Sequence, residues 1–144
     1  MPHAMAAFAA AAVILLHVQA AWADCSELNQ LAKPNMAALA SAGDHYRATG
    51  ASQVKYTLLG KADLPPNEVV IKAISETSKM IEAMEKYLDY MNSMKNGGCY
   101  GENVGAQSAV IVMFKAQRDE LVMDQKRFTE FLAKRLKVDG QPQQ

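Results

Sequence analysis

The chain has 144 residues, with 15 Lys or Arg balanced by 15 Asp or Glu, so its formal net charge is zero. This balance argues against nucleic acid as the main partner, because counterion release requires a concentrated positive surface. The chain is long enough for one domain with a hydrophobic core.

The first 23 residues are typical of an export signal. Ala6–Val18 is an apolar run with the length of a signal-peptide core, and it is shorter than the roughly 20 residues that span a bilayer. Ala21 and Ala23 supply small residues at the positions that a signal peptidase reads. We therefore expect cleavage after Ala23 and a periplasmic or secreted protein. A retained membrane anchor is the alternative. Residues 1–5 contain no Lys or Arg, which is unusual for an export signal and is compatible with a start codon further upstream.

The segment after the export signal predicts short helices. A helix over 26–33 is expected to end at Pro34, because proline disfavours the helical conformation of the residue before it. Asn35 is then expected to cap a second segment that continues through Tyr46. The sequence QVKYTLL, residues 53–59, is predicted to be helical, because a single strand would have no partner.

A long helix is predicted from Asn67 to Asn96. Pro66 and Asn67 favour a helix start, and Gly97 favours a stop. The helix has a wide apolar face with alternating four- and three-residue spacing, which indicates packing against more than one neighbour. The main row of this face consists of Val70, Ile74, Thr77, Ile81, Met84, Leu88 and Met91.

A second long helix is predicted from residue 104 or 108 to Val138, followed by a frayed polar tail over 139–144. Its expected buried stripe is widened by Met113 and Phe131. The stripe itself consists of Val110, Phe114, Gln117, Leu121, Phe128, Leu132 and Leu136.

These elements predict an all-α fold, an antiparallel three-helix bundle over residues 24–138, with a four-helix bundle as the alternative. Short connections make sequence neighbours antiparallel, which brings the turn after Asn96 to the end of the bundle where the first helix begins. Cys25 and Cys99, the two cysteines of the chain, are therefore expected at the same end. An exported protein meets an oxidising environment, so a Cys25–Cys99 disulfide is predicted.

No pattern in the sequence indicates catalysis, and we predict neither an enzyme nor a bound cofactor. A reactive thiol needs an activating base or cation, whereas the one histidine after the export signal, His45, lies in the first helical region. The chain has no C-x-x-C motif. Its glycines between 97 and 105 do not follow a strand and lack the lysine of a phosphate-binding loop.

Met80, Met84, Met91 and Met94 lie on one side of a single predicted helix. Methionine fills helix-bundle cores, which is the simplest interpretation, and it also forms adaptable binding surfaces. Tyr100 in the turn could cover the disulfide or, in that second interpretation, present an aromatic ring to the partner. A third interpretation is a soft-metal site for Cu(I), or a haem site, that uses the four methionines with His45.

The last helix ends in a basic amphipathic segment. Such a segment can lie on anionic membranes or bind acidic partners. The stronger alternative is that its apolar stripe faces the bundle, while the cations complement the helix dipole. The basic residues are Lys126, Arg127, Lys134, Arg135 and Lys137.

These observations lead to one main hypothesis of function. We expect an exported, non-enzymatic helical protein of the cell envelope that acts by binding a protein partner, as an adaptor, an accessory assembly component or a small chaperone. The alternatives are a Cu(I)- or haem-handling protein and a membrane-surface-binding protein.

Overall fold

The computed structural model describes the backbone of residues 3–61 and 64–139, and the side chains of residues 25–55, 57–58, 60 and 64–137. The predicted export signal, residues 1–23, lies outside the described side chains and stays a prediction. The same holds for the predicted tail, of which only Asp139 has a described backbone, as the last residue of a helix.

The described residues form helices and turns and contain no strand, which confirms the prediction of an all-α helical bundle. Residues 53–59 are helical as expected, since α2 runs into a short π-helical turn. In chain order the elements are α1 (His3–Ala48), α2 (Ala51–Tyr56), η1 (Thr57–Lys61), α3 (Asn67–Asn96), η2 (Gly101–Asn103) and α4 (Val104–Asp139).

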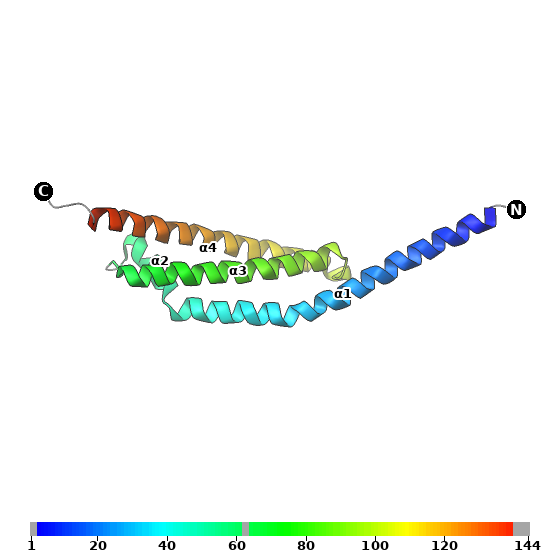
Figure 1. Ribbon diagram of the computed structural model, residues 1–144, viewed down its shortest axis with the longest axis horizontal. Coiled ribbons are helices and arrows are strands. Elements are labelled where there is room, and N and C mark those ends of the chain that lie inside the picture. Colours follow the sequence, from blue (N-terminus) through cyan, green and yellow to red (C-terminus); the bar gives the residue numbers. More distant parts are fainter. Residues whose placement is uncertain (1–2, 62–63, 140–144) are drawn as a thin grey trace.

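The three long helices are antiparallel neighbours, with α3 in the middle (Figure 1). α3 packs along one side against α1 and along another against α4, whereas the described parts of α1 and α4 barely touch each other. The short α2 contacts all three long helices and lies at the end of the bundle where α3 begins (Figure 1). The bundle is therefore open between α1 and α4.

Proline does not end the first helix, contrary to the expectation for residues 26–33. α1 continues through Pro34 to Ala48 and bends partway along its length (Figure 1). An internal proline removes one backbone hydrogen bond and typically bends a helix. Here Ala32 and Asn35 on either side of it are partly buried, and their packing supports the helix across the lost bond.

α3 has the predicted bounds, but Asn67 is not its cap. The cap residue is Pro66, whose carbonyl oxygen accepts hydrogen bonds from the backbone N–H groups of Val69 (3.1 Å) and Val70 (3.3 Å). The Asn67 side-chain oxygen is buried without a hydrogen-bond partner. These are the first backbone bonds of the helix, and no side chain caps its first turn.

α3 ends in a Schellman motif, which fixes the position of Cys99. Gly98 has a φ of 71°, its N–H donates to the carbonyl of Lys95 (3.0 Å), and the N–H of Cys99 donates to the carbonyl of Met94 (2.9 Å). This pair of bonds requires a left-handed residue, which glycine adopts without a steric cost. The turn brings the Cys99 side chain toward α1.

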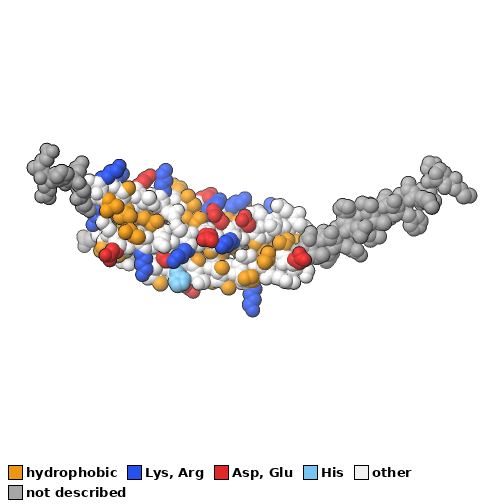
Figure 2. Space-filling view, viewed as in Figure 1, with side chains coloured by type: hydrophobic (Ala, Val, Ile, Leu, Met, Phe, Trp, Pro, Cys, Tyr) orange, Lys and Arg blue, Asp and Glu red, His pale blue; other side chains and the backbone are white. Residues whose placement is uncertain are grey.

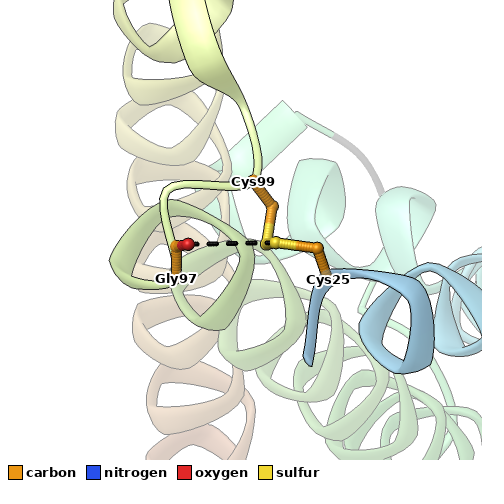
Figure 3. Close-up of a disulfide and its surroundings, with 3 residues drawn as sticks. All are labelled: Cys25, Gly97 and Cys99. Carbon is orange, nitrogen blue, oxygen red and sulfur yellow. Dashed lines mark hydrogen bonds between the residues drawn. A yellow bond between two sulfur atoms is a disulfide. The ribbon is translucent and has the colours of Figure 1, made fainter. Parts of the chain in front are cut away.

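The predicted disulfide between Cys25 and Cys99 is present, with Cα atoms 5.5 Å apart (Figure 3). The Cys25 sulfur lies 3.8 Å from the carbonyl oxygen of Gly97, a van der Waals contact because a disulfide sulfur carries no proton. In the part of the chain that the structure describes, this bond is the only covalent link, besides the chain itself, between α1 and the turn that joins α3 to α4.

The core consists of two clusters along α3. One lies near α2 and includes Val54, Val70 and Phe128; the other lies toward the disulfide end and includes Met91 and Ile111. Figure 2 shows one outer face of the bundle, on which acidic and basic side chains are interspersed.

The predicted stripe of α4 needs correction at five positions. Gln117, Leu136 and Met113, which was expected to widen the stripe, are exposed, whereas Ile111 is buried. The buried positions also include Asp124, whose exposed fraction is 1%. The stripe shifts around the helix because α4 packs against α3 and α2 and leaves its side toward α1 open.

Candidate functional site

The open side of the bundle contains an apolar groove between α1 and α4, with α3 as its floor. The groove has two compartments, and the one that we call the methionine groove has a volume of 270 Å³. It is lined by Met36, Leu39, Ala40, Gly43 and Arg47 of α1, Met80 and Tyr87 of α3, and Phe114 of α4.

Aromatic side chains form one wall of the methionine groove. The ring of Tyr87 lies 5.3 Å from that of Phe114 and 5.9 Å from that of Tyr90, in tilted arrangements that are favourable for aromatic pairs. Tyr100 is partly buried near this aromatic group. Its burial raises its pKa, and the nearby Tyr90 and Tyr87 raise it further.

A second compartment, with a volume of 230 Å³, continues the groove toward α2. Met80 lines both compartments and so connects them. The remaining lining residues are Tyr46, Lys55, Met84, Gln117, Glu120, Leu121 and Asp124.

A network of ion pairs closes this end of the groove. Lys55 of α2 donates to Asp124 (2.9 Å) and to Glu120 (2.5 Å), and Arg127 donates to the other oxygen of Asp124 (3.0 Å). The hydrogen bonds to Asp124 and Glu120 raise the pKa of Lys55, and the bond from Lys55 lowers the pKa of Glu120. The buried carboxylate of Asp124 thereby has two cationic partners.

The four methionines of the sequence prediction do not share one environment. Met84, Met91 and Met94 are buried, and Met91 packs with Leu88 and Ile111 in a core cluster. Met80 is partly exposed in the groove, and Met84 lines its second compartment. The structure thus brings two of the four methionines to the groove.

His45 lines neither compartment of the groove. It is exposed near the end of α1, and its charge helps to lower the pKa of Glu76 after the larger effect of the hydrogen bond from Lys79. Within the described residues, no group of three or more His, Cys, Asp and Glu side chains is arranged to hold a metal ion.

Two of the basic residues of α4 are held by neighbouring groups. Arg127 pairs with Asp124, and Arg135 donates to the Pro65 carbonyl (2.5 Å) while its guanidinium lies 5.7 Å from the Phe131 ring centroid. Membrane binding by this segment stays a prediction, which flotation with anionic vesicles at low and high salt tests.

Sequence reasoning missed the contributions of α1 and α2 to the groove, above all Met36, Leu39 and Lys55. Two features of the sequence pointed to these residues. Asp124 occurs three residues after Leu121 and four before Phe128, so it lies on the buried stripe and needs a buried cation. Met36 and Leu39 have the spacing of one face of the predicted segment from Asn35 to Tyr46, but the sequence does not show that α4 leaves this face uncovered.

Comparison with protein-family models, with curated proteins and with solved structures finds no match to this chain. Among the helices that the structure describes, none combines the length and the hydropathy needed to cross a membrane.

Proposed function

We propose that this protein is an exported, non-enzymatic component of the cell envelope that binds an amphipathic helix of a partner protein in the methionine groove. It would act as an adaptor, an accessory assembly component or a small chaperone. The main support for this proposal is the open arrangement of the bundle, in which the described parts of α1 and α4 flank α3 and barely contact each other.

A groove between two helices that pack on a common third helix has the shape that a fourth helix fills. A helix in this position would contact α1, α3 and α4 together and complete a four-helix bundle. It would also remove Met36, Met80 and Tyr87 from water, which favours binding through the hydrophobic effect. Flexible methionine side chains adjust to partners of different shape.

Export is supported by the cysteines. Cys25 and Cys99 form a disulfide with each other, and disulfides persist in oxidising compartments. The pairing leaves neither sulfur as a thiolate nucleophile, which is the form that cysteine chemistry requires. His45 is exposed near the end of α1 that lies opposite the disulfide.

Two charge substitutions on the same helix test the groove. Met36 lines it and is 56% exposed, and Leu31 lies outside it and is 49% exposed. Met36→Glu should lower the amount of partner that co-purifies from envelope extract at least tenfold, since an unpaired carboxylate would be buried in the complex. Leu31→Glu should retain the partner. Equal retention by both variants, or equal loss, contradicts the proposal.

A soft-metal function is the second candidate, because Met80 and Met84 line one cavity with Tyr46. Thioether sulfur is a suitable ligand for Cu(I). Anaerobic titration with Cu(I), followed by native mass spectrometry, should give a one-to-one adduct that Met80→Leu abolishes. The absence of an adduct in the unsubstituted protein eliminates this candidate.

A further inference from the structure

The first third of α4 is apolar around most of its circumference, but α3 covers only one side of it. From Val104 to Ala116 its polar side chains are Gln107, Ser108 and Lys115. The side with Ile111 and Phe114 packs against the core near Leu88 and Met91. A helix that is apolar all round is normally buried all round.

The uncovered side carries a continuous apolar surface, which we call the outer patch. Val112 is 67% exposed and Met113 is 51% exposed, and the flanking Ala109 and Ala116 are exposed as well. The four residues follow helical spacing and occupy one side of α4. This side faces neither α3 nor, within the described residues, any other element of the bundle.

We propose that the outer patch is the docking surface for a second copy of this chain, with the two α4 helices antiparallel. A twofold axis near Val112 and Met113 places Ala109 of each copy opposite Ala116 of the other. The patch is then complementary to itself, as a twofold interface requires. The alanines let the helices approach closely, and Val112 and Met113 fill the centre.

Charge selects the antiparallel orientation. Asp119 and Glu120 follow the outer patch directly, and Glu120 has a largely exposed side chain. In the antiparallel pair these carboxylates, which also pair with Arg118 and Lys55 of their own copy, lie beside the first turn of α4 in the second copy, which contains no acidic residue and carries the positive end of the helix dipole. A parallel pair would instead place the acidic residues of the two copies side by side.

The first test measures how the molecular mass of the protein in solution depends on the protein concentration. A narrow, single-helix interface gives weak association, so the full chain should sediment as a monomer at low micromolar concentration and shift toward a dimer at a few hundred micromolar. Val112→Glu should weaken association at least tenfold. Ile71→Glu is the matched control, because Ile71 is 54% exposed on α3, and it should associate normally.

A monomer at every concentration overturns the proposal, and so does equal weakening by the two variants. Circular dichroism confirms that each variant keeps its helical content before it is compared.

The second test fixes the orientation by disulfide cross-linking between Ala109→Cys and Ala116→Cys variants with the native disulfide intact. In the antiparallel pair position 109 lies opposite 116, whereas two copies of position 109 are separated by seven residues, about 10 Å along the axis. A disulfide needs Cα atoms within about 7 Å. A mixture of the two variants should therefore cross-link much faster than either alone. Fast cross-linking of each variant alone, or none in the mixture, overturns the antiparallel pair.

Discussion

Gly98 is the residue on which the position of Cys99 depends most directly. Its left-handed conformation allows the Schellman bonds that end α3, and one of these bonds holds the backbone N–H of Cys99. A Cβ at the neighbouring Gly97 would lie 3.2 Å from the Cys99 sulfur. Gly98 thus provides the left-handed conformation of the turn, and Gly97 leaves space for the Cys99 sulfur of the disulfide.

Gly98→Ala should lower the free energy of unfolding by about 1–2 kcal/mol, because a left-handed conformation costs an L-residue with a Cβ about that much. Gly105→Ala is the control. A Cβ at Gly105 in α4 would meet no atom within 4 Å beyond the neighbouring backbone of its own helix, so alanine there should stabilise the helix by about 0.5–1 kcal/mol. Urea unfolding of both variants measures the two changes, and a loss at Gly105 equal to that at Gly98 would contradict this account.

At the scale of elements, the attachment of α2 depends on a buried ion pair. α2 is six residues long, too short to be stable alone, and Lys55 joins it to Asp124 and Glu120 of α4. Val54 and Ala51 add apolar contacts to the core. Because α2 also closes one end of the groove, the ion pair affects the shape of the binding site.

Lys55→Met should destabilise the fold by about 2–4 kcal/mol, since it removes one of the two partners of a buried carboxylate. Lys86→Met removes an exposed pair with Glu82 and should change the stability much less, because water and salt screen such a pair. Chemical unfolding of both variants gives the comparison. Adding Asp124→Leu to Lys55→Met should recover part of the loss, and no recovery would show that the charge left unpaired is not the cause.

The contribution of the Lys55–Glu120 ion pair to the free energy of unfolding should decrease at both low and high pH. The pKa of Glu120 is lowered from its ordinary value of 4.5, so its contribution is present above that value and disappears as the pH falls through the lowered pKa. The pKa of Lys55 is raised from 10.5, so its contribution is present below that value and disappears as the pH rises through the raised pKa. The stability difference between the protein and Lys55→Met should therefore be constant from about pH 5 to pH 10 and decrease outside this window. Unfolding curves at intervals of one pH unit measure it.

At the scale of the molecule, the disulfide compensates for the few neighbours of α1. Among the described residues, α1 packs against α3 and α2 but barely against α4, and the bond closes a loop with a sequence separation of 74. Closing such a loop stabilises a fold by about 4.5 kcal/mol in the chain-entropy account.

Replacing Cys25 and Cys99 together by serine should lower the free energy of unfolding by about 2–4 kcal/mol while the far-ultraviolet circular dichroism changes little. Hydrogen exchange should speed up more in α1 than in α3, because α1 loses its covalent link and has fewer neighbours. Equal acceleration in the two helices would show that the bond does not act mainly on α1.

The sequence predicted the parts of the fold that depend on local patterns. Helical spacing predicted α3 from Asn67 to Asn96, and antiparallel topology predicted the Cys25–Cys99 bond. It did not predict that α1 continues through Pro34, because tertiary packing on both sides of the proline outweighs its local preference. It also did not predict the groove, since which faces of α1 and α4 remain uncovered depends on how both helices pack around α3.

In our proposal the methionine groove receives a helix of a partner protein. Site-specific photocross-linking in the producing cell tests this, with a photoreactive phenylalanine analogue placed at Met36 in one variant and at Leu31 in another. We predict a discrete protein adduct from position 36, a cross-linked peptide with the apolar spacing of an amphipathic helix, and little adduct from position 31. An equal adduct pattern at both positions, or no adduct at position 36, would contradict the claim.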